Sequence, residues 1–429
     1  MSQHLQQSQG LKIAVIGGGI SGIMAAYLLS RRHQVHLFEQ APKLGGHTHT
    51  HEIQEGPDAG LCVDMGFIVL NNRTYPVLNR FLDQLGILRA ATAMSFSFYD
   101  RQTSLFYSGT NVSGLFAQKS NLFKPSFWRL LLTIRQFCTQ AQKDVCSPEI
   151  ESLTLSEYLK LRSFSPFLAQ AYLLPMVSAI WSATEQDVRH FPALSLLRFF
   201  DNHGLLSLSN RPQWLYLPGG SQTYVQAFAR SFSGHIHTDA PVRRVQRDNG
   251  QVLVTVPAHG EGRFDAVVLA AHADQSFDLL ADPTDEERAC LAPWTYARNR
   301  VVLHTDTSML SPWKKGWACW NSVRESFMKP WEAVAVHYYM NRLQQLQATR
   351  DYVVSLNPRT DPARESVLEE VVFDHPQFTF EALQAQKTLH QLNLHSRTLF
   401  CGAYHGYGFH EDGARSGADV GREAFGIEL

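Results

Sequence analysis

The first part of the chain alternates short apolar runs with one longer apolar segment, a pattern that predicts a nucleotide-binding fold. Residues 12–16 read KIAVI and residues 34–39 read QVHLFE, and both runs are typical of buried strands. Residues 24–32, MAAYLLSRR, lie between them and predict a helix. A strand, a glycine-rich turn, a helix and a second strand together form half of a dinucleotide-binding unit.

The glycine-rich turn Gly17-Gly18-Gly19-Ile20-Ser21-Gly22 joins the first strand to the helix. We expect Gly17 to permit the tight turn, Gly19 to let a pyrophosphate approach the backbone, and Gly22 to let the helix pack closely on the sheet. Ile20 and Ser21 would begin the helix, whose free N–H groups and positive dipole end favour phosphate.

Glu39 ends the second strand, 22 residues after Gly17, where an acidic side chain can bind ribose hydroxyls. The alternative is a glycine turn with no ligand. Because both strands, the helix and the acid stand in register, the pattern favours a bound dinucleotide. NAD and FAD both fit this unit.

The middle of the chain predicts a second, mixed region. Residues 95–109 alternate like two strands with a turn between them, and residues 155–175 and 178–190 are apolar in helical spacing. Residues 125–137, PSFWRLLLTIRQF, predict an apolar and basic helix. This helix either faces the core with its arginines exposed, or contacts a membrane or the mouth of an apolar tunnel.

Later segments return to the first sheet. Residues 235–272 alternate like strands, with a DNG hairpin turn, and end in FDAVVLAAH, a buried parallel-strand run. Residues 398–402, TLFCG, predict another strand, followed by a loop and a helix that starts near Gly413. No linker, repeat or low-complexity segment divides the chain, so we expect interleaved domains.

Composition excludes several classes of protein. The chain has 429 residues, with 38 Lys and Arg against 39 Asp and Glu, which argues against a nucleic-acid partner. An apolar share of 44% indicates a folded protein. The polar start lacks the pattern of a secretory signal, and six scattered cysteines form no CxxC pair, so we expect reduced thiols in a cytoplasmic protein.

Three segments resemble one family of flavoproteins. Gly45 and Gly46 follow shortly after Glu39, residues 63–76 read VDMGFIVLNNRTYP, and residues 398–424 read TLFCGAYHGYGFHEDGARSGADVGREA. Together with the glycine turn, they resemble the amine oxidase and phytoene desaturase superfamily. The similarity is strongest to bacterial FAD/NAD(P)-binding flavoproteins that are found beside cyclopropane-fatty-acid synthases.

The resemblance implies an α/β fold, in which a Rossmann-type FAD-binding domain is interleaved with an α+β substrate-binding domain. The FAD-binding domain would comprise residues 1–90, 212–275 and 395–429, and the substrate-binding domain residues 91–211 and 276–394. The implied cofactor is FAD, bound without a covalent link. Cys401 could carry a covalent flavin, but a small buried strand residue is the favoured interpretation.

The resemblance also assigns cofactor contacts beyond the glycine turn and Glu39. His47 stands where the family usually has Arg or Lys, and Ala403 stands where it often has an acid. The implied cofactor-binding residues in these later segments are Gly45, Gly46, His47, Thr48, Val242, Gly402, Gly413 and Ala414. Of these, Val242 would face the adenine, and the N–H groups near Gly413 and Ala414 would face the flavin pyrimidine ring.

His405, His410 and Tyr404 are the candidate catalytic residues, because imidazole titrates near neutrality and the loop 404–410 is dense in aromatic and histidine side chains. A packed aromatic loop is the alternative. His47, His49 and His51 have period-two spacing, which places them on one face of a strand. We expect no metal site there, since no carboxylate or cysteine partner is identifiable.

The resulting hypothesis is an FAD-dependent oxidoreductase that takes a hydride from a hydrophobic, fatty-acyl-like substrate at flavin N5, or desaturates or isomerises it. The 26 Phe, 14 Tyr and 8 Trp fit an aromatic-lined cavity for that small molecule. The alternatives are a flavin-dependent amine oxidase and a non-catalytic FAD-binding partner of a lipid-modifying enzyme. Contact with a membrane surface is a further expectation.

Overall fold

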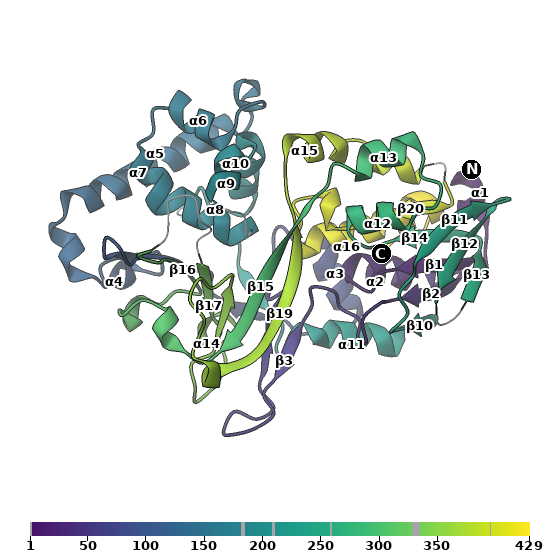
Figure 1. Ribbon diagram of the computed structural model, residues 1–429, viewed down its shortest axis with the longest axis horizontal. Coiled ribbons are helices and arrows are strands. Elements are labelled where there is room, and N and C mark those ends of the chain that lie inside the picture. The colour runs from purple at the N-terminus through teal and green to yellow at the C-terminus, as the bar shows by residue number, and fades with distance from the viewer. Residues whose placement is uncertain (1, 182–184, 208–210, 258–259, 328–334, 395) are drawn as a thin grey trace.

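The computed structural model describes residues 2–181, 185–207, 211–257, 260–327, 335–394 and 396–429. Figure 1 shows an α/β part that contains both ends of the chain, a helical lobe at the opposite end, and two long strands running between them. This architecture confirms the predicted fold class.

A five-stranded parallel sheet forms the centre of the α/β part. Its strands are β1 (Lys12–Ile16), β2 (Gln34–Phe38), β10 (His235–His237), β14 (Ala266–Leu269) and β20 (Thr398–Phe400), in the order β10-β2-β1-β14-β20. β14 pairs with β1 in parallel, as the run FDAVVLAAH predicts. Four distant segments of the chain therefore meet in one sheet.

Both faces of this sheet are covered, which explains its continuous apolar strands. Ile13 and Val15 of β1 pack against α2 (Ile20–Leu29) and α16 (His410–Phe425) in one core cluster. Ala14 and Ile16 belong to another cluster, which includes residues of an antiparallel three-stranded sheet. That sheet consists of β11 (Arg244–Asp248), β12 (Gln251–Val256) and β13 (Gly260–Phe264).

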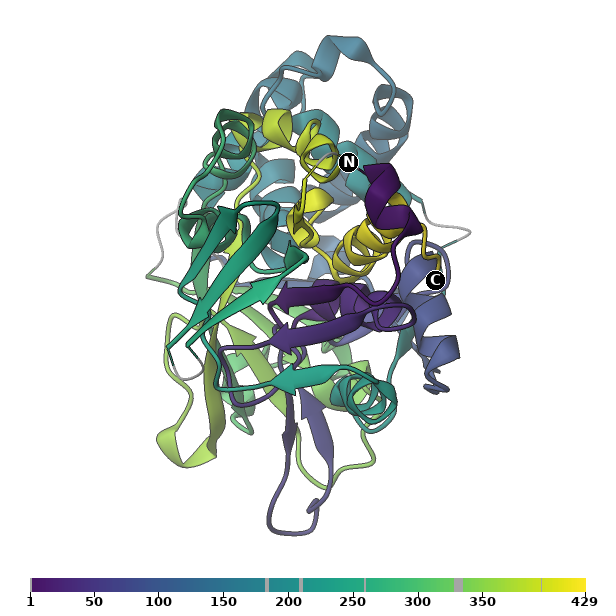
Figure 2. The same cartoon turned by 90° about the vertical axis from the view of Figure 1, so that its right-hand side faces the viewer.

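The two ends of the chain pack together (Figure 2). The N-terminal helix α1 (Ser2–Gln7) lies beside α16, and Gln6 Nε2 donates to Glu423 O over 2.8 Å. The sequence prediction that the last helix starts near Gly413 is wrong, because α16 begins at His410.

A seven-stranded sheet forms the second layer, in the order β19-β15-β18-β17-β16-β7-β8. Its strands are β7 (Phe96–Asp100), β8 (Leu105–Ser108), β15 (Tyr296–His304), β16 (Trp320–Arg324), β17 (Ala335–Tyr339), β18 (Val353–Leu356) and β19 (Val367–Pro376). The predicted strand pair in residues 95–109 is confirmed. The chain thus leaves the five-stranded sheet and re-enters it, while the domain boundaries given above stay a prediction.

The helical lobe comes from one continuous part of the chain. Its helices are α4 (Val112–Leu115), the 3-10 helix η1 (Lys119–Phe123), α5 (Pro125–Asp144), α6 (Leu155–Leu161), α7 (Pro166–Leu168), α8 (Leu174–Trp181), α9 (Glu185–His190) and α10 (Ala193–Asn202). Phe137 and Tyr158 are buried in its core. No helix in the described ranges is both long enough and apolar enough to cross a bilayer.

Further short strands and α-helices lie between these elements along the chain. The short strands are β3 (Thr50–Glu52), β4 (Cys62–Asp64), β5 (Val69–Asn71), β6 (Ala90–Thr92) and β9 (Trp214–Tyr216). The helices are α3 (Pro76–Gln84), α11 (Gln222–Ser231), α12 (Ala273–Leu279), α13 (Asp285–Leu291), α14 (Met340–Leu343) and α15 (Phe380–Gln386).

Candidate active site

The glycine turn after β1 has the geometry that its three spaced glycines predict. Gly17 has φ +109°, and a Cβ on it would lie 2.7 Å from Ala270 O. A Cβ on Gly22 would lie 1.9 Å from Gly17 O, so α2 can approach the turn only without a side chain there. A Cβ on Gly19 would meet nothing within 4 Å, which leaves the space beside the start of α2 open.

This open space favours an anion. Gly19 caps α2 without a side-chain hydrogen bond, and the first turn of the helix has no acidic residue. The N–H groups of Ile20 and Ser21 are among those that a helix leaves without an intrahelical acceptor. A pyrophosphate placed beside Gly19 would meet free donors and the positive end of the helix dipole.

Glu39 is fixed beside the turn by backbone donors. Its Oε2 accepts from Gly18 N over 2.7 Å, and its Oε1 accepts from Ala41 N over 2.8 Å. The loop before β11 lies along the same segment, since Ala240 N donates to Glu39 O. Val242 is buried two residues beyond Ala240. The structure therefore places Glu39 and Val242 in the same neighbourhood, as an adenosine site requires.

The second glycine pair lies directly over the first turn. Gly45 N donates to Gly18 O over 2.8 Å. Gly45 and Gly46 have φ values of +134° and +56°, and a Cβ on Gly46 would lie 3.1 Å from Gly19 Cα. The two motifs therefore lie in contact, although Gly45 follows Gly17 by 28 positions in the chain.

His47 is partly buried beside the end of β19. Its Nε2 lies 3.1 Å from Asp374 O, and its ring stacks on Phe373 with the ring centres 4.9 Å apart. Burial lowers the pKa of His47 to about 4. A neutral imidazole does not supply the positive charge that Arg or Lys brings to this position in the family, so any cofactor contact of His47 is a neutral one.

His410 connects the start of α16 to the same region. Its ring stacks on Phe67 with centres 3.8 Å apart, and its Nε2 lies 2.9 Å from Thr48 Oγ1. Thr48 Oγ1 also lies 2.6 Å from the hydroxyl of Tyr224. Burial lowers the pKa of His410 to about 3, so its imidazole is neutral at pH 7 and accepts or donates one hydrogen bond at Nε2.

The other two candidate catalytic residues point elsewhere. Tyr404 and His405 contact each other, with ring centres 4.7 Å apart, and Tyr404 packs on Trp294. Neither Tyr404 Oη nor His405 Nε2 has a hydrogen-bond partner in the described part of the chain. Burial lowers the pKa of His405 to about 3. Of the three, only His410 contacts Thr48, which lies two residues after the pair Gly45-Gly46.

The geometry of α16 corrects the role predicted for Gly413. Gly413 N donates to Phe409 O over 3.0 Å and is therefore not free for a ligand. A Cβ on Gly413 would lie 2.8 Å from Ile20 Cγ2, so this glycine lets α16 pack closely on α2. Ala414 is fully buried in the core cluster that also contains Ile13 and Ile20. The helix N–H groups without an intrahelical acceptor are those that start at His410.

Gly402 and Cys401 follow β20. Gly402 N and O both bond to Ser416 Oγ, at 2.9 and 3.1 Å, which fixes the strand end to α16. Cys401 is fully buried in the core with Ile13 and Val15, and burial raises the pKa of its thiol. A buried, protonated thiol fits a packing role and not a covalent flavin link.

The acids of the C-terminal segment have structural partners. Glu411 accepts from the backbone N–H groups of Val77 and Leu78, and so caps α3. Asp412 accepts from Tyr407 N and Phe409 N and pairs with Arg415. Neither carboxylate replaces the acid that the family often has at the position of Ala403.

The three histidines with period-two spacing face the same neighbouring strand, although only His51 lies within β3. His49 Nε2 lies 2.7 Å from Glu369 Oε1, and His51 Nδ1 lies 2.6 Å from Glu369 Oε2. Like His47, both side chains therefore face β19. Within the described residues, no group of His, Cys, Asp and Glu has a geometry suited to a metal ion.

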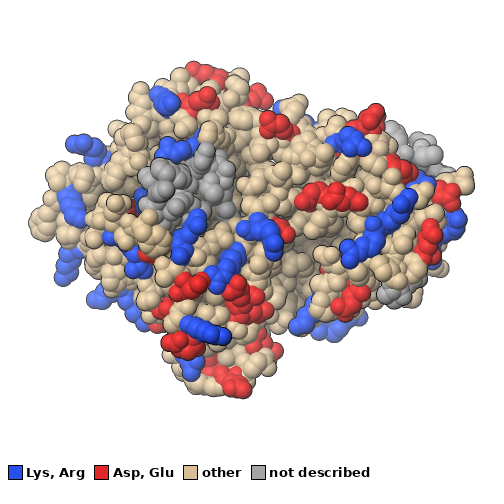
Figure 3. Space-filling model, in the orientation of Figure 1, with Lys and Arg blue, Asp and Glu red and all other residues tan. Residues whose placement is uncertain are grey.

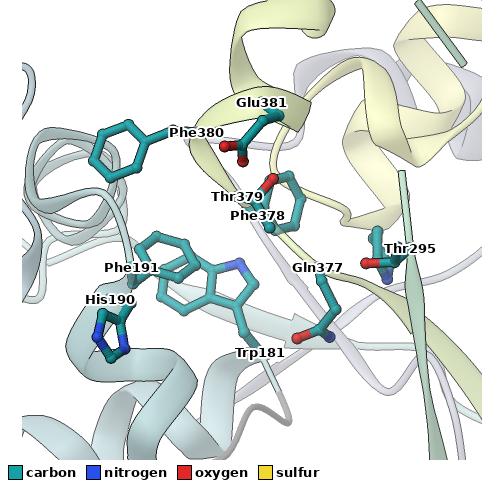
Figure 4. A pocket seen from close by; sticks show the side chains of 10 residues that line it. Trp181, His190, Phe191, Thr295, Gln377, Phe378, Thr379, Phe380 and Glu381 are labelled. Carbon is teal, nitrogen blue, oxygen red and sulfur yellow. The ribbon is translucent and has the colours of Figure 1, made fainter. Parts of the chain in front are cut away.

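A pocket of about 350 Å³ lies between the helical lobe and the end of β19 (Figure 4). It is lined by Trp181, His190, Phe191, Thr295, Pro376, Gln377, Phe378, Thr379, Phe380 and Glu381. Sequence reasoning did not identify these residues, because the lobe and β19 are distant along the chain. The run QFTF after β19 was the only local signal.

Aromatic rings connect this pocket to the loop before α16. Trp181 packs on Phe199 with centres 4.6 Å apart, and Phe199 stacks on Phe409 with centres 5.1 Å apart. Phe409 directly precedes His410 in the chain. Two rings, those of Phe199 and Phe409, therefore lie between the pocket wall at Trp181 and the start of α16.

These features fit FAD. Gly17 and Gly22 allow the tight turn and the close approach of α2, and Gly19 leaves room for a pyrophosphate at the start of that helix. Glu39 lies beside the turn, and Gly46 adds exposed backbone next to it. The conformation of each glycine is a property of the backbone and needs no ligand to hold it.

Comparisons with known proteins agree with this assignment. The family model of flavin-containing amine oxidoreductases matches residues 20–342. AofH of Mycobacterium tuberculosis, which carries the name of a flavin-containing monoamine oxidase, is 27% identical over 63% of this chain and 59% of its own length. The chain therefore matches less than two thirds of that relative.

Two solved structures share the fold over nearly their whole length. The CLA-producing fatty acid isomerase from P. acnes has a TM-score of 0.66 at 14% identity, covering 96% of this chain and 98% of its own. Cyclohexylamine oxidase from Brevibacterium oxydans has a TM-score of 0.67 at 14% identity, covering 96% and 99%. With a matched family model over most of the chain and this fold, the protein belongs to the flavin-containing amine oxidoreductases, and its cofactor is FAD.

Proposed function

We propose that this oxidoreductase acts on a hydrophobic substrate with a long apolar chain, of the fatty-acyl kind. The observation that carries the proposal is the aromatic pocket beside β19. Trp181, Phe191 and Phe378 form its apolar walls, and Gln377 and Thr295 add polar groups at one side (Figure 4). An apolar pocket with a few polar groups suits a hydrophobic ligand that has one polar end.

The histidines beside the two glycine motifs do not attract the charged end of a substrate. Burial lowers the pKa values of His47, His375 and His410 to about 4, 3 and 3. All three side chains are therefore uncharged at pH 7, so they can orient a substrate through hydrogen bonds without attracting an ion. FAD would supply the acceptor for a hydride from a substrate C–H bond.

The residues around His410 would limit access of water. Phe67 covers one face of the imidazole, and Thr48 and Tyr224 occupy its Nε2 side. A dry environment strengthens the electrostatic interactions that orient reacting groups. We assign His410 a positioning role, because its low pKa makes it a weak base at neutral pH.

One observation favours an amine as a second candidate. Glu381 lies on the pocket wall with Phe378 and Phe380, and its own backbone N–H and the Thr379 hydroxyl lower its carboxyl pKa. A carboxylate among aromatic rings can bind an ammonium group through charge and cation–π contacts. AofH and cyclohexylamine oxidase carry amine oxidase names.

Anaerobic flavin bleaching distinguishes the two candidates. The holoprotein would be mixed without oxygen with an unsaturated fatty acid, and in parallel with the primary amine of equal chain length. Bleaching or product formation with the acid, checked by mass spectrometry for desaturation or double-bond movement, supports the proposal. Turnover of the amine alone supports the second candidate. If the flavin is reduced by light but by neither compound, and no product forms, both proposals are wrong and a non-catalytic role gains support.

A further inference from the structure

The outer end of the helical lobe combines exposed apolar side chains with unpaired cations. Four apolar residues of η1 and α5 are exposed, and the side chains of Phe123, Leu132 and Trp128 are 85%, 60% and 46% accessible. The fourth is Leu122. Trp128 is held in place, because its Nε1 donates to Leu122 O over 3.0 Å. We call this group, with the cations described next, the η1–α5 surface.

Charge is segregated on this surface. Residues 102–143 contain five cations and no Asp or Glu, whereas the whole chain is nearly balanced. The five are Lys119, Lys124, Arg129, Arg135 and Lys143. Within the described ranges, none of them is in an ion pair. Figure 3 shows blue side chains gathered at the left end of the molecule, where Figure 1 places α4, α5 and α7.

The cations and the apolar residues share one side of the helix. Trp128, Leu132 and Arg135 stand at positions i, i+4 and i+7 of α5, which lie on one face. Lys124 directly precedes the helix and Phe123 precedes Lys124. The opposite face, with Phe127, Leu130 and Phe137, is buried in the lobe. α5 thus has an ordinary core face and a second, exposed face that is apolar and basic.

One neighbouring element adds a further cation to this surface. η5 (Lys314–Gly316) lies beside α4 and contributes the exposed Lys315. The nearest exposed acids along the chain, Glu149 and Glu151, follow the far end of α5. The buried Asp144 is already paired with Arg162.

We propose that the η1–α5 surface binds an anionic lipid bilayer, with Phe123, Trp128 and Leu132 entering the interface and the cations contacting lipid phosphates. An interfacial helix of this kind gains from apolar burial and from attraction to anionic lipid together. This inference does not depend on the substrate, because the surface lies on the outer end of the lobe.

Vesicle co-sedimentation tests the proposal with the FAD-loaded protein. Sucrose-loaded vesicles of phosphatidylcholine and phosphatidylglycerol (3:1) should bind it at least tenfold more strongly than phosphatidylcholine alone, and binding should weaken as salt rises. Replacing one cation of this surface by an acid changes its net charge by two units, so Lys124→Glu and Arg129→Glu should each weaken binding at least fivefold. Phe123→Ser should weaken it about tenfold.

Matched variants serve as controls. Leu88→Ser removes a side chain of similar exposure, 78%, outside the lobe, and Arg230→Glu reverses an exposed charge on α11. Both should leave vesicle binding unchanged. The flavin spectrum of each variant reports that the protein is folded.

A second measurement locates the contact. Lipids brominated on their chains should quench part of the tryptophan fluorescence, and Trp128→Phe should abolish most of that quenching while the protein still binds. Three results would overturn the proposal: no binding to either vesicle, equal binding to both, or a dimer in light scattering that Phe123→Ser dissociates while vesicles bind nothing. The last result would identify a second copy of the chain as the occupant.

Discussion

His410 Nε2 lies 2.9 Å from Thr48 Oγ1, although 362 residues separate the two side chains in the sequence. Thr48 follows the second glycine pair, and His410 begins α16. This contact connects the two ends of the chain at the proposed cofactor site. It also singles out His410 among the three candidate catalytic residues.

Two alanine substitutions in the glycine turn should have different effects. Gly19→Ala adds a methyl group where no atom lies within 4 Å, at φ −75°, so the fold should be unaffected. The methyl group would occupy space needed by the pyrophosphate, and we expect the Kd for FAD to rise at least tenfold. Gly22→Ala places Cβ 1.9 Å from Gly17 O and should lower the free energy of unfolding by about 1–3 kcal/mol. Flavin titration and urea denaturation check the pair; equal FAD affinity in Gly19→Ala and wild type would remove the pyrophosphate from this place.

His410 predicts a defined pH dependence of stability. Burial lowers its pKa from 6.5 to about 3, so the unfolded chain binds a proton between these values and the folded chain does not. Its contribution to stability is therefore fully present above about pH 6.5 and is lost as the pH falls toward 3. The same sign holds for His47 and His375.

In the variant His410→Phe, unfolding should take up one proton fewer between these pH values. Between pH 6 and pH 5, the free energy of unfolding should fall by about 1.4 kcal/mol less in the variant than in wild type. Urea denaturation at saturating FAD, repeated at each pH, measures the difference. A variant with an unchanged pH slope would show that His410 is already charged, or solvent-exposed, in the folded protein.

Asp64 should be essential for stability, because it holds three segments together. Its carboxylate accepts from Ser221 N and Oγ, from Gln344 Nε2 and from Thr50 Oγ1. Asp64→Ala would leave these buried donors without an acceptor and should cost more than about 3 kcal/mol. Asp64→Asn keeps the shape and one acceptor, so we expect a smaller loss. Thermal unfolding of both variants decides; equal and small losses would mean that water replaces the carboxylate.

The pocket rim can be tested with a matched pair of apolar residues that have similar exposure. Phe380 lines the pocket and is 36% exposed, whereas Leu368, outside the pocket lining, is 38% exposed on β19. Phe380→Asp should raise KM for a hydrophobic substrate about tenfold and leave the melting temperature unchanged, because it puts a charge where the apolar chain enters. Leu368→Asp should change neither. Steady-state kinetics with the substrate found by flavin bleaching makes the comparison, and similar KM values in both variants would exclude this pocket as the substrate site.

Local spacing could predict the glycine turn and the acid that follows it. The turn from Gly17 to Gly22 could be assigned because a tight turn and close helix packing require glycine at particular positions, and Glu39 because it ends the second strand. The pair Gly45-Gly46 came from the family resemblance, and both glycines have positive φ values in the structure. The prediction for the end of the chain was less accurate. The helix starts at His410 and not near Gly413, because Asp412 accepts from Tyr407 N and Phe409 N and so stabilises an earlier helix start.

The sequence by itself determined the nucleotide-binding unit and the interleaved strands, since these follow from periodicity and from residues close together in the chain, and three of its motifs carry the family resemblance. Only the tertiary structure decided which histidine reaches Thr48, that Glu411 caps α3, and that Trp181 and Phe378 share a pocket. The physical reason is that burial and partner choice depend on contacts between distant segments, and a side chain's pKa and hydrogen bonds follow from those contacts.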